Sequence, residues 1–501
     1  MVSDANRCHK GDIMGKSCKK WNKWKKLVLT FLVICFLTGC TTQGTSQKQP
    51  VKIVVWHYYT GIQKDAFDAL VQEFNETKGQ EEKIEVEAVS QVSIQNLIEA
   101  LRQSEQKEVG AAELPDIFNT YADFAYESEK AGLLADLAPY MTEYEINEYV
   151  EEYIEEGRFG EKNSLKIFPI AKSTEVLMIE GTQWEEFSQK TGAKYSDLAT
   201  WEGVVKTAEK YYDYTDALTP EPEDGKAFFG RDALANYIFL GSKQLGCEIL
   251  RKTEDGKEQV FLDKSIMKKI WDCYYIPYIK GYFTKNGKFA TDDIKTGDTI
   301  AFIGSTVSAA YFPNEVERQD GSVVTARGIA LPVPNFEGTS PYCIQQGAGM
   351  SVIKSDEQHE AAAVTFLKWL TQENRNISFC ADSGYLPVKE VAYDFALWEK
   401  IHSKKNSAGS PFMAEVIKTS VNQMSTSSLF TSQAISCGYD IRVLLEQRLA
   451  ERAKEDREIV KERIAQGMSL QQAVAEFTSK EYFETWFSSV KEEMKGLVEG
   501  E

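Results

Sequence analysis

The sequence predicts an α/β protein with two lobes, each built on a mixed, mostly parallel sheet that is flanked by helices. From residue 51 onward, β-rich runs alternate with amphipathic helical stretches, a pattern typical of βαβ units. The alternation resumes after Ile167 with longer helical stretches, which indicates the second lobe. From Tyr439 onward the pattern is nearly all helical, which predicts a helical C-terminal extension.

In the first lobe, strands and helices follow one another at short intervals. Residues 52–56 form a β-rich run, and the amphipathic stretch after it is expected to end at Gly79. Residues 84–89 alternate apolar and polar side chains as a strand does, and residues 115–118 begin a third strand. In parallel sheets, ligands bind beyond the carboxyl ends of the strands, so these ends are the first places to look for a site.

The second lobe carries clear start signals for helices. Residues 174–179 are expected to form a buried strand, and Thr200 is placed to cap a helix that starts at Trp201. Ser469 and Gln472 form a capping box near the end of the chain. Further strands are expected at residues 300–304, 328–333 and 349–353, and a helix at 356–370.

The N-terminus has the pattern of a secretion signal. Residues 16–26 hold six lysines, and the uncharged run 27–37 is too short to span a bilayer core of about 30 Å as a helix. The next residues end in Cys40 and resemble the lipobox of bacterial lipoproteins. That resemblance implies a lipoprotein signal peptide over residues 1–39 and a lipidated tether over 40–50. Cys40 would carry a diacylglycerol thioether, with a further acyl chain such as palmitate on its amine.

Composition argues against several classes of function. The formal charge is −19 for the whole chain and about −25 without residues 1–40, which hold eight Lys or Arg and two Asp. So acidic a chain lacks the basic face that nucleic acid binding needs. Its histidines and cysteines do not show the spacing of metal ligands, so no metal and no cofactor is expected.

Several segments occur in a fixed order along the chain: residues 54–57 with Gly61, 74–75 with Gly79, 115–118, 172–177, 200–202, 366–371 and 384–388. Together they resemble the family 1 extracellular solute-binding proteins of ABC importers, most of which carry sugars. The resemblance implies a periplasmic-binding-protein-like fold of class II, whose two lobes close on a ligand by hinge bending. It also implies a membrane-anchored, extracytoplasmic monomer that binds a mono- or oligosaccharide and delivers it to the transmembrane subunits of an ABC permease, without catalysis.

The resemblance also sets expected domain limits. Lobe I is expected at 51–176 and 351–391, and lobe II at 177–350 and 392–501. The chain is expected to cross between the lobes near Val176, Ser351 and Val391.

Sugars offer hydroxyl groups at their edges and C–H patches on their faces, which polar side chains and aromatic rings bind respectively. Of Tyr58 and Tyr59, one is expected to face away, because neighbours on a strand alternate. Glu175 could equally form a structural ion pair, Trp201 could pack in the core, and Tyr385 is expected to be a structural corner. The predicted ligand-binding residues are Tyr58, Tyr59, Tyr121, Asp123, Ser173, Thr174, Glu175, Trp201, Ser305, Thr306, Gln346 and Gly347.

Other functions remain open on sequence grounds. The first alternative is a binding protein for sn-glycerol 3-phosphate or its diesters, although residues 419–441 contain no basic side chain to meet a phosphate. Arg231, Arg327 or Arg375 could serve instead. From another class, a secreted glycoside-acting enzyme or a sensor or adhesin lipoprotein could use the same fold. A glycosidase needs two carboxylates across a cleft, which spacing along a chain does not reveal.

Overall fold

The computed structural model describes residues 49–160, 164–253, 256–317, 321–393 and 411–499. Every helix and strand of these ranges belongs to the compact unit that residues 51–501 form. The predicted signal peptide and the lipidation site Cys40 lie outside the described residues. Within the described ranges, no helix combines the length and the apolar character that crossing a bilayer requires.

The first sheet joins β15 (Gly349–Val352), β3 (Ile117–Thr120), β1 (Val51–His57) and β2 (Ile84–Ser90), in that spatial order. β1 runs parallel to β2 and β3, whereas β15 runs antiparallel to β3. The expectation of a mostly parallel sheet is confirmed here, as are all four predicted strands.

Helices cover both faces of the first sheet because alternate side chains of β1 point to opposite sides. Ile53 and Val55 join one apolar cluster, which also contains Phe67 of α2. Trp56 points the other way and belongs to a second cluster with Leu97 of α4. The covering helices are α2 (Gly61–Glu76), α13 (Glu357–Leu370) and α14 (Glu373–Ser383) on the first face, and α4 (Ile94–Glu105) and α5 (Ala122–Lys130) on the second.

The second sheet joins β13 (Gly328–Leu331), β6 (Glu175–Glu180), β10 (Ala301–Ser305) and β7 (Phe229–Arg231), in that order. β10 is parallel to β7, but β6 is antiparallel to both β10 and β13. The expectation of a mostly parallel sheet is therefore wrong for this lobe. Strand propensity does not encode direction, and β6 pairs with strands more than a hundred residues further along the chain.

All six residues of β6 are buried, because helices cover both faces of this sheet as well. Leu177 and Ile179 pack with side chains of α8, α9 and α11, whereas Val176 and Met178 pack in the cluster that includes α16. The elements are α8 (Gly181–Thr191), α9 (Trp201–Asp216), α10 (Leu234–Gln244), α11 (Lys264–Ile279), α12 (Ala290–Lys295) and α16 (Pro411–Thr426). At the start of α9 the predicted cap is confirmed, since Thr200 Oγ1 accepts a hydrogen bond from the Gly203 amide.

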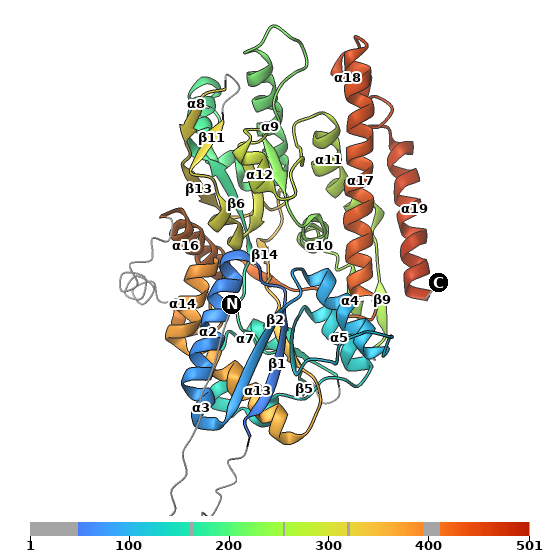
Figure 1. Cartoon of the computed structure of the whole chain (residues 1–501). Coiled ribbons are helices and arrows are strands. Elements are labelled where there is room, and N and C mark those ends of the chain that lie inside the picture. Colours follow the sequence, from blue (N-terminus) through green and yellow to red (C-terminus); the bar gives the residue numbers. More distant parts are fainter. Residues whose placement is uncertain (1–48, 161–163, 254–255, 318–320, 394–410, 500–501) are drawn as a thin grey trace, which may run out of the picture. The chain divides into compact units, whose positions relative to one another are not determined.

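The C-terminal extension is helical, as predicted, and packs beside α10 and α11 (Figure 1). It comprises α17 (Gly438–Ala465), α18 (Leu470–Val474) and α19 (Lys480–Glu499). Leu445, Leu449 and Ala453 recur every four residues on the buried face of α17. Trp486 of α19 packs on Trp271 of α11 with ring centroids 4.6 Å apart. The predicted capping box of Ser469 and Gln472 opens α18.

The chain passes between the two sheets in short paired segments. Phe168 bridges Met350, and Ser173 bridges Gln346, so one crossing lies directly beside the other. The remaining elements are α3 (Lys78–Glu82), η1 (Ala138–Tyr140), α6 (Glu143–Ile146), α7 (Glu151–Glu156), β4 (Arg158–Phe159), β5 (Ser164–Leu165), η3 (Tyr195–Ala199), β8 (Leu250–Lys252), β9 (Glu258–Val260), η4 (Thr306–Tyr311), β11 (Glu315–Glu317), β12 (Val323–Thr325), β14 (Tyr342–Ile344), η5 (Glu390–Tyr393) and β16 (Ser428–Phe430).

Candidate functional site

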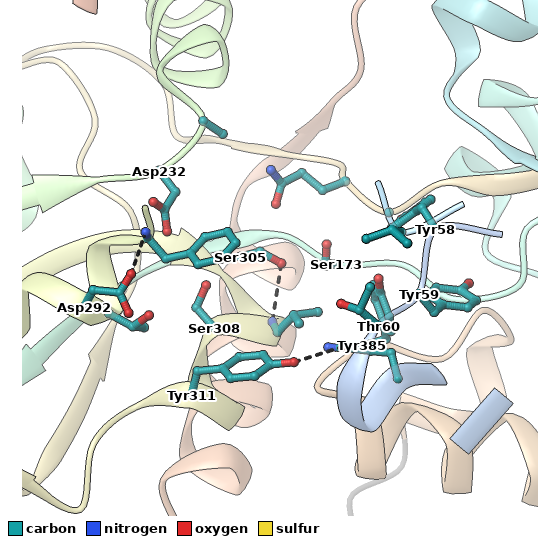
Figure 2. Close-up of a pocket in the computed structure, with 18 of the residues that line it drawn as sticks. Tyr58, Tyr59, Thr60, Ser173, Asp232, Asp292, Ser305, Ser308, Tyr311 and Tyr385 are labelled. Atoms are coloured by element: carbon teal, nitrogen blue, oxygen red, sulfur yellow. Dashed lines mark hydrogen bonds between the residues drawn. The ribbon is translucent and has the colours of Figure 1, made fainter. Parts of the chain in front are cut away.

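A cavity of about 520 Å³ lies between the two lobes, beside the paired crossing segments. Its walls come from both sheets, so a molecule inside it touches both lobes at once. Seven of the predicted ligand-binding residues line it: Tyr58, Tyr59, Tyr121, Ser173, Ser305, Gln346 and Gly347. Figure 2 shows the tyrosines of the first lobe on one side, and the serines and aspartates of the second lobe on the other.

The first-lobe wall is aromatic. Tyr58 and Tyr59 follow the end of β1, with ring centroids 5.3 Å apart, and Tyr385 meets Tyr59 edge-on at 6.1 Å. Tyr58 is half-buried at the cavity, whereas Tyr59 is 3% exposed and packs on Phe67 and Phe379 in the core, so the expectation that one of them faces away is confirmed. Burial raises the pKa of the Tyr58, Tyr59 and Tyr385 hydroxyls, so they remain neutral phenols that can donate and accept hydrogen bonds.

The second-lobe wall is rich in polar groups, although the exposed ring of Phe289 also lines it. Part of it lies just after the end of β10. There Ser305 Oγ accepts a hydrogen bond from the Val307 amide, 3.3 Å away, and so caps the start of η4. Tyr311, at the other end of η4, donates to Gln63 Oε1 of α2 at 3.1 Å and so links the lobes across the cavity mouth. The other polar groups on this wall are Asp232, Thr291, Asp292, Lys295 and Ser308.

The base of the cavity is built by the crossing segments. The amides and carbonyls of Ser173 and Gln346 pair reciprocally at 2.9 Å. Gly347 has φ +91°, and a Cβ there would lie 2.7 Å from the Ala171 carbonyl oxygen, so no larger residue fits without a backbone shift. Within the described part of the chain, the Oε1 atom of Gln346 is buried and has no hydrogen-bond partner. This unused acceptor beside the cavity marks a place where a bound donor would be accommodated.

A second cavity of about 460 Å³ adjoins the first and shares Tyr121, Ala233 and Gln346 with it. Its lining contains four charged side chains, Glu156, Arg442, Glu446 and the predicted residue Asp123. Asp123 is buried, and Arg442 Nε lies 3.9 Å from its Oδ2. Burial raises the pKa of Asp123 to about 6, although Arg442 acts in the opposite direction.

The raised pKa makes a testable contribution to stability. A carboxyl whose pKa is raised in the folded state binds its proton more tightly there than in the unfolded state, so the free energy of unfolding increases as the proton binds. For Asp123 this increase occurs as the pH falls from about 6, the folded pKa, toward 3.8, the ordinary value. We expect wild type to gain roughly 1 to 3 kcal/mol relative to Asp123→Asn between pH 7.5 and pH 4.5. Urea denaturation of both proteins at each pH measures the difference. A difference that does not change with pH would contradict the raised pKa.

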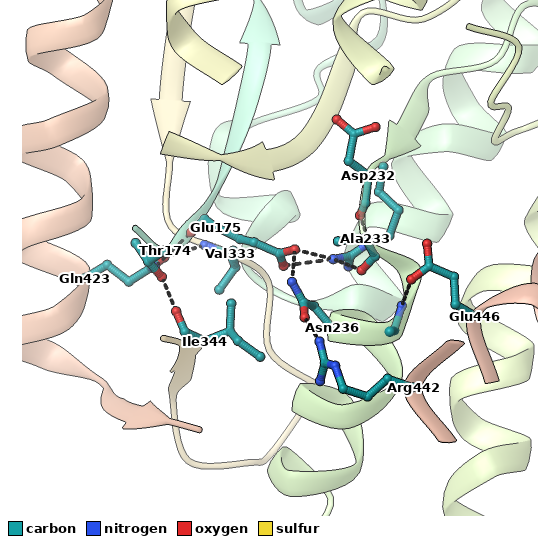
Figure 3. Close-up of polar contacts among 12 residues, drawn as sticks. Thr174, Glu175, Asp232, Ala233, Asn236, Val333, Ile344, Gln423, Arg442 and Glu446 are labelled. Atoms are coloured by element: carbon teal, nitrogen blue, oxygen red, sulfur yellow. Dashed lines mark hydrogen bonds and ion pairs between the residues drawn. The ribbon is translucent and has the colours of Figure 1, made fainter. Parts of the chain in front are cut away.

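Four predicted residues do not line either cavity. Thr174 Oγ1 is buried and donates to the Ile344 carbonyl at 2.7 Å, and Thr306 is fully buried. Glu175 is buried in an ion pair with Arg231, the structural alternative that its sequence position allows (Figure 3). Trp201 is 3% exposed and packs in the core of the second lobe. The structure does not bring these four residues to either cavity: each lies at the start of a strand or helix or just before it, and its side chain is buried.

Other lining residues were not predicted. Tyr385 lines the cavity, although its sequence context predicts a structural corner. Ser308 and Tyr311 lie within six residues of Ser305, so extending the search past the strand end would have included them. Asp232 follows β7, a three-residue strand too short to recognise from its pattern.

Comparisons with known proteins agree with this geometry. The model of the bacterial extracellular solute-binding protein family matches residues 69–406. A search of curated proteins finds no significant sequence match. Solved structures with the same fold include a cyclic α-maltosyl-1,6-maltose binding protein from Arthrobacter globiformis, with TM-score 0.62 and 16% identity over 88% of this chain and 99% of that one.

Two further structures are similar to the same extent. An ABC substrate-binding protein from Listeria monocytogenes in complex with cycloalternan has TM-score 0.63 and 13% identity, over 89% of this chain and 100% of that one. A Mycobacterium tuberculosis protein in complex with glycerophosphocholine has TM-score 0.62 and 16% identity, over 86% of this chain and 100% of that one. Because the sequence identities are only 13–16%, the similarity to these three structures shows that the chain shares their two-lobed fold.

Proposed function

Because the chain belongs to the bacterial extracellular solute-binding protein family, we propose that it captures a carbohydrate between its two lobes and delivers it to the permease of an ABC importer. One observation carries the choice of ligand: an aromatic wall in the first lobe faces a wall of hydroxyls and carboxylates in the second. Rings cover the C–H faces of a sugar, and the polar groups opposite bind its hydroxyls. Two of the structural relatives bind or hold oligosaccharides, which supports the same class.

The proposed mechanism is capture by closure, without covalent chemistry. A ligand that touches the tyrosines and the serine wall together stabilises the closed arrangement over the open one, because only the closed arrangement offers both sets of contacts. The Tyr311–Gln63 hydrogen bond already joins the lobes at the mouth of the cavity. The pair of adjoining cavities gives room for more than one sugar ring.

A glycerol phosphate or its diester is the second candidate, and a solved relative in complex with glycerophosphocholine favours it. The lining charge of the first cavity argues against it. Lys295 is the one cation that the described residues place in this lining, and its Nζ lies 3.9 Å from the Asp292 carboxylate, whereas the other lining carboxylate, Asp232, pairs with Lys285. A phosphate in this cavity would meet two carboxylates for one ammonium group.

The same proposal covers attachment and domain limits. Cys40 would hold the protein at the extracytoplasmic face of the cell membrane through its lipid, as a monomer. Lobe I would span 51–176 and 351–391, with the remainder, including the helical tail, in lobe II. Mass spectrometry of the protein isolated from membranes tests the anchor: a mature N-terminus at an acylated Cys40 is the expected result, and an unmodified cysteine would contradict it.

The function is tested by thermal unfolding of the ligand-free protein in the presence of mono- and oligosaccharides, polyols and glycerol phosphodiesters. We expect one carbohydrate class to raise the melting temperature increasingly with concentration, as linkage requires. Stabilisation by glycerol phosphates alone would establish the second candidate instead. No stabilisation by any compound, with folded and ligand-free protein, would favour a sensor, an adhesin or an enzyme.

The placement of the site is tested by Ser305→Ala and Gln346→Ala. Each variant is expected to weaken binding of the identified ligand roughly three- to tenfold, because each loses a hydrogen bond to it. The melting temperature of ligand-free Gln346→Ala should stay nearly unchanged, since Gln346 Oε1 has no partner among the described residues. Ser305→Ala loses the hydrogen bond from the Val307 amide, so its ligand-free form should be slightly less stable. Calorimetric titration measures the affinities, with Gln80→Ala, an exposed residue of α3, as the control. Wild-type affinity in both site variants would place the ligand elsewhere.

A further inference from the structure

A separate, basic cavity lies on the second lobe and shares no lining residue with the ligand cavity. It has a volume of about 340 Å³ and is bordered by α17, the end of α11 and the loop after it. We propose that it is a binding site for an oxyanion with two or more charges, such as a phosphate group. Its lining contains Lys226, Lys285, Lys454, Arg457 and Lys461 against two carboxylates, Asp298 and Glu458.

This charge balance opposes that of the whole protein. The chain carries a net charge of −19, yet the lining of this cavity has five cations and two anions. A concave surface with one dominant sign of charge concentrates counter-ions locally, whatever the net charge elsewhere. A random surface patch of this protein would be acidic, so the local excess of cations points to an anion.

The carboxylates present do not neutralise the cations. Lys461 Nζ pairs with Glu458 at 2.8 Å, and Lys285 Nζ lies 3.1 Å from Asp232, outside the cavity lining. In the described part of the chain, no carboxylate oxygen lies within 4.0 Å of the charged nitrogens of Lys226, Lys454 or Arg457. These three groups therefore have charge and hydrogen-bond donors to offer a ligand.

Arg457 is held in place by the backbone. Its Nη1 donates to the Ile279 carbonyl at 3.1 Å, and Lys226 Nζ donates to the Gly297 carbonyl at 3.2 Å. A Cβ at Gly281, which has φ +86°, would lie 2.3 Å from Arg457 Nη2, so the guanidinium occupies space that only glycine leaves free. Desolvation lowers the pKa of Arg457, and a bound anion would compensate this loss of hydration.

The chemistry of the donors favours phosphate over chloride or a single carboxylate. A guanidinium presents parallel N–H donors that match two oxygens of a phosphate, and ammonium groups add point charges around it. Three unpaired cations against the one remaining carboxylate, Asp298, leave two positive charges, which balance an ion with two negative charges. Pyrophosphate is the probe of choice because it carries several charges in a small volume.

The test is calorimetric titration of the full-length protein with pyrophosphate, with sodium chloride at matched ionic strength as the reference. Wild type is expected to bind pyrophosphate at one site. Arg457→Gln should weaken this binding by about tenfold or more, as for the loss of a charged hydrogen-bond donor. Lys454→Gln should weaken it severalfold. This variant keeps the fold, because Lys454 is exposed and its ammonium group forms no hydrogen bond or ion pair within the described ranges.

Lys480→Gln is the matched control, because Lys480 is an exposed lysine of α19 outside the cavity and its loss should not change pyrophosphate binding. A soluble short-chain phosphatidic acid, titrated in parallel, distinguishes a lipid headgroup from a free phosphate as the source of the group. No binding above the chloride reference would overturn the proposal. So would wild-type affinity in the Lys454→Gln protein, or binding that the Ser305→Ala and Gln346→Ala variants lose and Lys454→Gln retains.

Discussion

Replacing Glu175 with Gln is expected to lower the free energy of unfolding by about 3 to 5 kcal/mol, the usual cost of breaking a buried ion pair from one side. Arg231 Nη2 donates to both carboxylate oxygens of Glu175, at 2.8 and 2.9 Å, and both side chains are almost fully buried. Asn236 Nδ2 donates to the same carboxylate at 3.0 Å (Figure 3). Without the carboxylate, the guanidinium would be left charged in the interior of the second lobe.

Urea denaturation of the two proteins measures this effect. The matched control is Glu185→Gln, which breaks the pair of Glu185 with Arg327, where both side chains are about half exposed. Exposed pairs contribute about 0 to 1 kcal/mol, so this variant should unfold almost as wild type does. Equal, small effects in both variants would mean that the Glu175 pair is not buried in solution. Loss of ligand affinity by Glu175→Gln with unchanged stability would restore Glu175 to the ligand site.

Trp201→Ala is expected to destabilise the protein by about 3 to 5 kcal/mol, as large-to-small substitutions of buried aromatic residues do. The indole ring packs edge-on against Tyr237 at 4.6 Å and against Phe229 at 6.0 Å. The Arg231 guanidinium lies 5.9 Å from its centroid. Removing the ring opens a cavity in the core of the second lobe and leaves its neighbours without contacts.

The same variant separates a core role from a ligand-binding role. At a temperature where Trp201→Ala is still folded, its ligand affinity should be close to wild type, because Trp201 lines neither cavity. Tyr144→Ala, which truncates an aromatic ring that is 76% exposed, is the stability control and should cost little. Unchanged stability together with weaker binding would show that Trp201 stacks on the ligand.

Much of the fold could be predicted because its signals are local. The buried run of β6 and the cap formed by Thr200 each depend on side chains close together in the sequence. The direction of β6 relative to β10 could not be predicted, because it depends on how the chain crosses between the lobes. At that crossing Ser173 pairs with Gln346, a residue far away in the sequence.

The site was predictable where a strand end opens directly into the cavity, as at Tyr58 and Ser305. It was not predictable where membership of the site depends on whether one side chain points into the cavity or into the protein interior. Ser173 lines the cavity, but its neighbours Thr174 and Glu175 point into the protein, toward Ile344 and Arg231. Polar character alone does not distinguish these neighbours, since each finds a buried partner that lies far away in sequence.

The order of the elements along the chain has a consequence for folding. The first sheet is incomplete until β15 is added, and the core of the second lobe includes Trp486 from the last helix. A chain synthesised from its N-terminus therefore cannot complete the first sheet until Val352 has been added, or the core of the second lobe until Trp486 has been added. Contacts between segments that are distant in the sequence slow folding, because the chain loses conformational entropy on closing the loop before packing contributes favourable free energy. Either lobe expressed alone would lack core-forming segments, so the two lobes should fold together in one cooperative step rather than one after the other.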